Sequence, residues 1–163
     1  MSVFKSQFSR ALEVIPTDNA NVPYPAPVGS GTNTSAVTNQ LVNTSGNFIN
    51  LNVRTGDIVY NTTDGTAATV VSVTSATVIV LNADIFAASG KTYTIYQASS
   101  QTTIGNYGCF LYIGGAGNVT VTTIGQDIVT FTAVPLGTVL PVQVIKVHSL
   151  ASGTTATLIN AIW

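Results

Sequence analysis

Charged side chains are scarce in this chain. Asp, Glu, Lys and Arg make up 7% of its 163 residues, and the formal net charge is −1, whereas an ordinary soluble domain is about 25% charged. The basic residues are scattered, apart from Lys146 and His148. A chain without a basic patch has no general electrostatic attraction to nucleic acid or to an anionic membrane. We therefore expect neither of these partners.

Cysteine and histidine each occur once, as Cys109 and His148. A single cysteine cannot form an internal disulfide, and a zinc site needs several Cys or His ligands. His148 has no Ser-x-Gly elbow and no Cys partner in the sequence, whereas a catalytic triad needs nucleophile, base and orienting group within reach. We expect His148 at an interface or at a strand end.

Motifs for cofactor and metal chemistry are equally sparse. The Gly-rich stretch 113–118 lacks the Lys-Ser/Thr of a phosphate-binding loop, so we interpret it as a hairpin turn. Four aspartates lie outside any calcium-loop pattern, and turn capping is the favoured role for them over a bound ion: Asp57, Asp64, Asp84 and Asp127. The sequence therefore predicts no enzyme, cofactor, metal or small-molecule substrate.

Long hydrophobic runs are also missing. No apolar stretch approaches the roughly 18 residues of a membrane span. Residues 1–10 lack the apolar core of a secretory signal, which indicates synthesis in a cytoplasm.

The chain is instead rich in Val, Ile, Ala, Thr, Ser and Asn. Val, Ile and Thr favour strands because their branched β-carbons pack well on a pleated sheet. From residue 41 onward, short β-branched runs alternate with turn signals, including a hairpin signal at Asp64-Gly65. Pro141 falls inside such a run and predicts an edge or a bulge. This pattern is typical of an all-β, small antiparallel β-sandwich or barrel.

The first forty residues show a different pattern from the β-branched runs that follow. Phe4, Phe8, Leu12 and Ile15 recur at helical spacing, so residues 2–15 form either a short helix or an arm that orders on docking. Prolines at 23, 25 and 27 favour an extended segment. The compositions of residues 29–38 and 99–103 suggest two linkers.

Sheets without charge are poorly protected against edge-to-edge pairing, so we expect a protein that is built to be assembled. The Pro-rich segment suits an extended strap across a neighbouring subunit, with a ligand for a proline-recognition domain as the alternative. Tryptophan at the end of the chain suits a core or an interface. The candidate partner-binding residues are Phe4, Phe8, Pro23, Tyr24, Pro25 and Trp163.

Residues 108–163 contain LYIGGAGNVTVTT (111–123), IVTFTAVPLG (128–137), LPVQV (140–144) and GTTAT (153–157). These words resemble a β-rich, jelly-roll-like module of tailed-phage and gene-transfer-agent virion proteins, in which a segment like ALEVIPTD (11–18) precedes the rest. The block between them resembles another phage structural element, through VRTGDIVYN (53–61), ATVVSV (68–73), LNADIF (81–86) and YTIY (93–96).

The resemblance implies a split β-domain that carries an inserted small β-barrel or sandwich. Residues 1–30 would hold an N-terminal arm and the first strand, residues 31–100 the inserted domain with flanking linkers, and residues 101–163 the remainder. It also implies a capsid decoration (cement) protein on the outside of the virion head, bound to the major capsid protein, as a homo-oligomer with a trimer favoured. The alternatives are a spike-base, fibre-base or tail/baseplate protein, or a host-surface glycan-binding module that uses Tyr93, Tyr96 and Tyr107.

Overall fold

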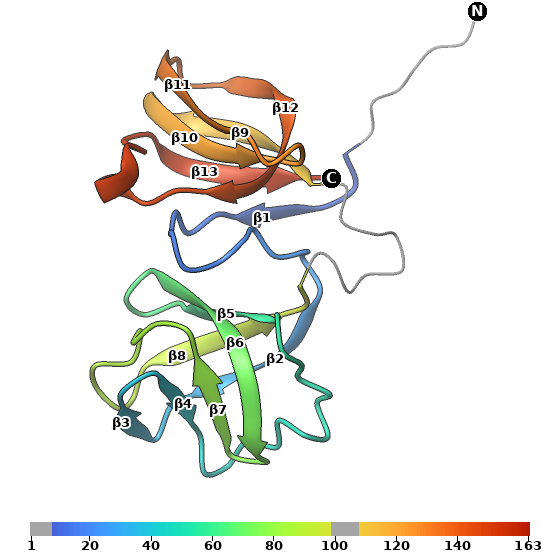
Figure 1. Cartoon of the computed structure of the whole chain (residues 1–163), viewed down its shortest axis with the longest axis vertical. Coiled ribbons are helices and arrows are strands. Elements are labelled where there is room, and N and C mark those ends of the chain that lie inside the picture. Colours follow the sequence, from blue (N-terminus) through green and yellow to red (C-terminus); the bar gives the residue numbers. More distant parts are fainter. Residues whose placement is uncertain (1–7, 99–107) are drawn as a thin grey trace, which may run out of the picture.

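The computed structural model describes residues 8–98 and 108–163. Within these ranges the regular elements are strands, apart from a single 3-10 turn, η2 (Leu150–Ser152), and every strand pairing is antiparallel. The strands form two sheets, which lie one above the other in Figure 1. The all-β antiparallel fold class predicted from the sequence is confirmed.

The first sheet has six strands. One face of it covers a core that includes Leu111, Val121 and Ile159, because successive side chains of a strand point to opposite faces of a sheet. In spatial order its strands are β1 (Ala11–Glu13), β13 (Thr157–Ile162), β9 (Cys109–Gly115), β12 (Thr138–Val147), β10 (Gly117–Thr123) and β11 (Ile128–Val134).

The second sheet has seven strands and a separate core. Phe48 and Phe86 are fully buried in it, with ring centroids 6.3 and 6.4 Å from that of Tyr93. In spatial order its strands are β2 (Pro27–Thr32), β8 (Thr92–Tyr96), β5 (Ile58–Asn61), β6 (Thr66–Ser75), β7 (Val78–Leu81), β4 (Gln40–Val42) and β3 (Ser35–Val37).

A third, smaller core joins the two sheets. Tyr60 and Ala20 are buried in it, and Leu12 and Ile15 pack against it from the chain around β1. The backbone carbonyl of Asn19 accepts hydrogen bonds from Thr69 Oγ1 (2.9 Å) and Asn82 Nδ2 (2.7 Å). The segment of residues 14–22 therefore holds the second sheet against the first.

The chain enters the first sheet at β1, leaves it to build the whole second sheet, and returns at β9. β1 pairs with β13, so the strand inferred near residue 11 from the resemblance is present. The second sheet already begins at Pro27, within the range that the sequence assigned to the arm. The domain limits at 30 and 100 stay a prediction.

The linker predicted at residues 29–38 is wrong, because strands β2 and β3 occupy it. Its glycines serve close packing instead of flexibility. A Cβ on Gly29 would lie 2.7 Å from Leu51 Cδ1, and one on Gly31 would lie 2.8 Å from the Tyr93 hydroxyl. The predicted second linker at 99–103 lies outside the described residues.

Of the two alternatives for residues 2–15, the helix is wrong where the structure describes the chain, because residues 11–13 form β1 and pair with β13; an arm that orders on docking stays a prediction. A segment this short gains more from joining a sheet edge than from a marginal isolated helix.

The hairpin predicted at residues 113–118 is wrong, because β12 lies between β9 and β10. Between β9 and β10 the chain bends sharply, and the glycines of this bend lie against residues 155–157. A Cβ on Gly117 would lie only 2.5 Å from the backbone nitrogen of Ala156, so glycine is needed for close approach.

By contrast, the hairpin at Asp64-Gly65 is confirmed, with Gly65 at φ 65°. The irregularity expected at Pro141 is also confirmed, as a register shift between Leu140 and Val144.

Candidate interaction surface

The first sheet exposes an apolar face on the side opposite its core. In β9, Cys109, Leu111 and Ile113 are buried, so Phe110 and Tyr112 point the other way. The strand register places Phe110 beside Ile162 and Ile162 beside Ala11, and it places Tyr112 between Val139 and Asn160. We call this surface the outer face; its residues are Ala11, Phe110, Tyr112, Val139, Asn160 and Ile162.

The outer face combines exposure with low charge. Tyr112 is 40% exposed and its neighbour Val139 is 42% exposed. Phe110 and Tyr112 each lie in a row of side chains that runs across neighbouring strands. Among the described residues of these two rows, Glu13 is the one charged side chain, and it pairs with Asn160. Two large side chains side by side on a rigid sheet are the kind of anchor on which protein interfaces depend.

Phe8 extends this surface toward the N-terminal end of the chain. Its ring meets that of Phe110 edge-on, with centroids 5.9 Å apart, and it is 43% exposed. The structure thus places one predicted partner-binding residue at the rim of the outer face. Phe4, also predicted, lies outside the described residues.

The Pro-rich segment lies against its own chain. The ring of Tyr24 meets Trp163 edge-on at 5.8 Å, and the Arg10 guanidinium lies 5.3 Å from the Tyr24 centroid. Arg10 Nη1 donates to the carbonyl of Pro25 at 2.9 Å, and Pro23 is buried. Trp163 packs against the first core, as a core tryptophan would. A partner-binding role for these residues stays a prediction.

His148 directly follows β12, at a strand end as expected, and belongs to a polar clamp. The carboxylate of Asp18 accepts hydrogen bonds from His148 Nδ1 (2.8 Å), from Ser149 Oγ and from Ser152 Oγ (2.9 Å). With its proton on Nδ1, the ring accepts at Nε2 from the Thr122 hydroxyl, at 2.8 Å.

An acid, an imidazole and a hydroxyl in line also describe the relay of a nucleophilic enzyme. Here, however, two serines hold the second oxygen of Asp18, and Lys146 Nζ donates to the Asp18 backbone carbonyl at 3.1 Å. All of these contacts fasten the segment of residues 14–22 to the first sheet, so we interpret the group as a structural clamp. Sequence reasoning missed it because Asp18 and His148 are 130 residues apart.

The clamp should weaken in acid. Hydrogen bonds from Ser149, His148 and Ser152 lower the pKa of Asp18 from 3.8 to about 2, against a smaller opposing effect of burial. A carboxyl with a lowered folded-state pKa stabilises the fold above its unfolded pKa, and this contribution disappears as the pH falls through about 2. Urea midpoints should therefore differ between the parent and Asp18→Asn near neutral pH, and converge toward pH 2. Parallel pH profiles would contradict the clamp.

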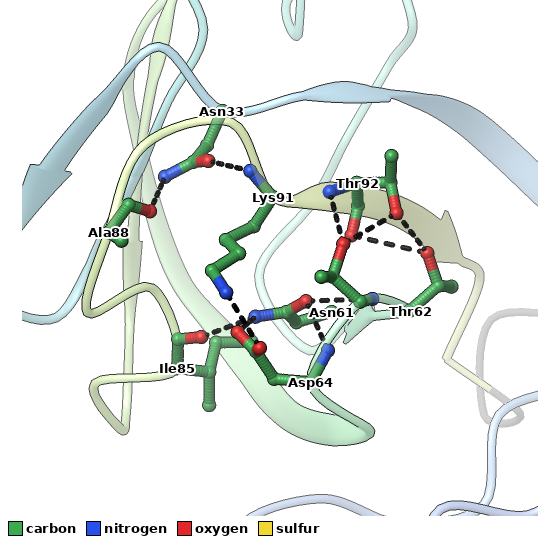
Figure 2. A network of polar contacts seen from close by, with 9 residues as sticks. Asn33, Asn61, Thr62, Asp64, Ile85, Ala88, Lys91 and Thr92 are labelled. Carbon is green, nitrogen blue, oxygen red and sulfur yellow. Dashed lines mark hydrogen bonds and ion pairs between the residues drawn. The ribbon is translucent and has the colours of Figure 1, made fainter.

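A second polar network fastens the loops of the second sheet (Figure 2). Lys91 Nζ donates to Asp64 Oδ1 and Asn61 Nδ2 donates to Asp64 Oδ2, each at 2.8 Å, and both contacts lower the pKa of Asp64. The backbone of Lys91 donates to Asn33 Oδ1 at 2.7 Å. Asp64 thus forms an ion pair. Turn capping is confirmed for Asp57, whose Oδ2 accepts from the backbone of Arg54 at 2.8 Å.

A hollow of about 410 Å³ opens beside β1, between the two sheets. Residues 13–16 line one wall and residues 154–159 the other. Glu13 is the one charged residue in its lining, which also includes Thr154, Thr155 and Thr157.

Of the three tyrosines named for glycan recognition, Tyr93 is buried. It is 3% exposed, and its hydroxyl accepts from Asn43 Nδ2 at 2.8 Å, so it cannot stack on a sugar. Tyr96 is partly exposed and packs edge-on against Tyr60 at 5.3 Å. Tyr107 lies outside the described residues. The glycan-binding alternative stays a prediction for Tyr96 and Tyr107.

Over the ranges 8–98 and 108–163, no group of three or more His, Cys, Asp or Glu side chains is placed to hold a metal ion. Among the same residues, no helix has both the length and the apolar character to cross a membrane. Comparisons of the chain with protein-family models, with curated proteins and with solved structures found no match.

Proposed function

We propose that this chain is a capsid decoration (cement) protein of a tailed phage, which binds the outside of the head shell and stabilises it. The observation that carries the proposal is the outer face: a nearly uncharged sheet surface with Tyr112 and Val139 exposed side by side. The proposal also draws on the virion-protein resemblance of residues 108–163.

The partner in this proposal is the major capsid protein. An apolar surface with an aromatic anchor binds by desolvation and shape, because few charges are present to attract a partner from a distance. Phe8 lies at the rim of the same surface, and in this proposal the predicted N-terminal arm extends the contact to a neighbouring subunit. A chain that stabilises a shell in this way would be synthesised in the host cytoplasm and then remain on the virion.

A homo-oligomer, with a trimer favoured, fits the same role. Symmetric assembly repeats one weak apolar contact several times, and linked contacts bind more tightly than each one does alone. The second sheet would then project from the shell or bridge to a neighbour, held in place by the third core around Tyr60.

The second candidate is a spike-base, fibre-base or tail/baseplate protein. The same outer face could bind a vertex or tail partner, and virion β-modules are reused at all of these positions. Copy number separates the two candidates: a head-surface protein is present in hundreds of copies per particle, and a vertex or tail protein in dozens or fewer.

The experiment adds purified protein to emptied, expanded heads that lack it. The proposal expects saturable binding over the whole shell, with bound copies counted by quantitative mass spectrometry and located by cryo-electron microscopy. Binding confined to one vertex, or to tails mixed in as a control, would favour the second candidate. Absence of binding to either structure would contradict both.

A further inference from the structure

A second, smaller hollow of about 230 Å³ lies where the two sheets meet, beside the third core. Figure 1 shows β1 on the side of the first sheet that faces β5. Leu12, Glu13 and Ile15 line the hollow from the chain around β1, and Tyr60 and Tyr96 line it from the second sheet. Junctions between structural units are common places for small-ligand sites.

The two tyrosines form aromatic walls at a steep angle to each other. Tyr60 comes from β5 and Tyr96 is the last residue of the neighbouring strand β8, where it pairs with Ile58. Their ring centroids lie 5.3 Å apart and their planes make an angle of 67°. Tyr60 is buried in the third core and Tyr96 is partly exposed. The face of an aromatic ring carries partial negative charge and attracts cations.

Glu13 adds a full negative charge to this lining. It is the one charged residue that lines the hollow. Glu13 is exposed, and no other side chain in residues 8–98 and 108–163 forms an ion pair with it. Burial is the main cause that raises the pKa of Tyr60, and the charge of Glu13 contributes in the same direction. The carboxylate therefore lies within electrostatic reach of the Tyr60 ring.

We propose that this hollow binds a trimethylammonium group, as in choline, with its methyl groups against Tyr60 and Tyr96 and its charge near Glu13. Aromatic rings of this kind recognise quaternary ammonium groups in proteins. The volume is below the roughly 300–1,000 Å³ of pockets for drug-sized ligands, which suits a small head group.

The apolar part of the lining favours a quaternary over a primary ammonium. A primary ammonium has three N–H donors to satisfy and is strongly hydrated. A trimethylammonium group has no donors, so Leu12 and Ile15 can pack against its methyl groups without leaving a polar group unpaired.

This site is independent of the proposed function. None of its residues belongs to the outer face, and binding of a small cation is a property of the isolated protein. Its test therefore needs no heads, and its failure would leave head binding by the outer face untouched.

The experiment titrates the isolated protein with choline chloride and follows the backbone amides by NMR, with sodium chloride keeping the ionic strength constant. Saturable shifts should appear around residues 12–15, 60 and 96, with a dissociation constant on the order of 1 mM. The matched ligand is dimethylbutanol, in which a carbon atom replaces the nitrogen of choline and removes the charge. It should bind about tenfold more weakly, and methylammonium should also bind more weakly than choline.

Variants assign the binding to this hollow. Glu13→Gln keeps the shape of the side chain and should weaken choline binding about fivefold, whereas Asp84→Asn removes an exposed carboxylate elsewhere and should not. Tyr96→Leu should abolish measurable binding, and Tyr96→Phe should retain it because the ring remains.

Phosphocholine separates two sources of the same group. Binding of choline alone would indicate a free cation, and binding of both would indicate a head group that carries phosphate; either result supports the site. Equal binding of choline and dimethylbutanol, or shifts that do not saturate, would overturn the proposal. Unchanged choline binding by Tyr96→Leu would overturn it as well.

Discussion

Tyr112→Asp should weaken binding to emptied heads by roughly 30-fold, since truncating an aromatic anchor at the centre of an interface costs about 2 kcal/mol or more. Tyr112 lies in the middle of the outer face, between Val139 and Asn160. An aspartate there removes the ring and forces an unpaired carboxylate to lose water on contact. The measurement is a binding isotherm on heads that lack the protein.

The matched control for this variant is Ile49→Asp. Ile49 is a large, exposed apolar residue that precedes β5 of the second sheet, away from the outer face. The same loss of apolar surface and gain of charge should leave head binding unchanged there. Tyr112→Phe should retain most of the affinity. If Tyr112→Asp binds as tightly as the parent, the outer face is not the capsid-binding surface.

Gly117→Ala should destabilise the first sheet by about 3 kcal/mol, through overpacking and lost hydrogen bonds. The added Cβ would lie 2.5 Å from the nitrogen and 2.7 Å from the Cα of Ala156. Both are backbone atoms and cannot rotate away. The displaced residues carry the bonds from the backbone nitrogens of Thr155 and Ala156 to the Asn118 carbonyl, at 2.8 and 3.0 Å.

The thermal midpoint of Gly117→Ala should therefore fall by roughly 6–12 °C in calorimetry. Gly125→Ala is the control, because its added Cβ would meet only the side-chain oxygens of Asp127 and Thr123, at 3.3 and 3.6 Å. That variant should melt close to the parent. Equal midpoints for Gly117→Ala and the parent would mean that the corner between β9 and β10 is looser than described.

Strand positions could be predicted from the sequence where β-branched runs are long enough to pair. The runs in β10, β11 and β12 can be recognised without knowledge of their partners, because branched side chains favour extended backbone wherever they lie. The same holds for the turn at Asp64-Gly65, whose glycine supplies the positive φ locally.

Glycine-rich segments were misread because glycine has the same signature in a flexible loop and in a crowded strand. At Gly31 in β2, the hydrogen-bonded Tyr93 hydroxyl and Asn43 Nδ2 occupy the space where a Cβ would stand, at 2.8 and 2.9 Å. The stretch at 113–118 was read as a hairpin because consecutive strands usually pair. Here β12 comes between them, and only the three-dimensional structure reveals that order.

The sequence predicts an interaction surface without giving its position. Scarce charge predicts assembly, and Phe8 is one of the predicted partner-binding residues. Tyr112 and Val139 became neighbours only through the β9–β12 register. Likewise, the clamp brings Asp18 to His148 across almost the whole chain. Pairings of such high sequence separation leave no local pattern.

We propose that this chain stabilises a phage head from the outside, and differential scanning calorimetry of heads measures that stabilisation. Emptied, expanded heads should disrupt at a higher temperature with the protein than without it. The shift should persist in moderate salt, because apolar contacts are little affected by ionic screening. An unchanged disruption temperature at saturating protein would contradict the account.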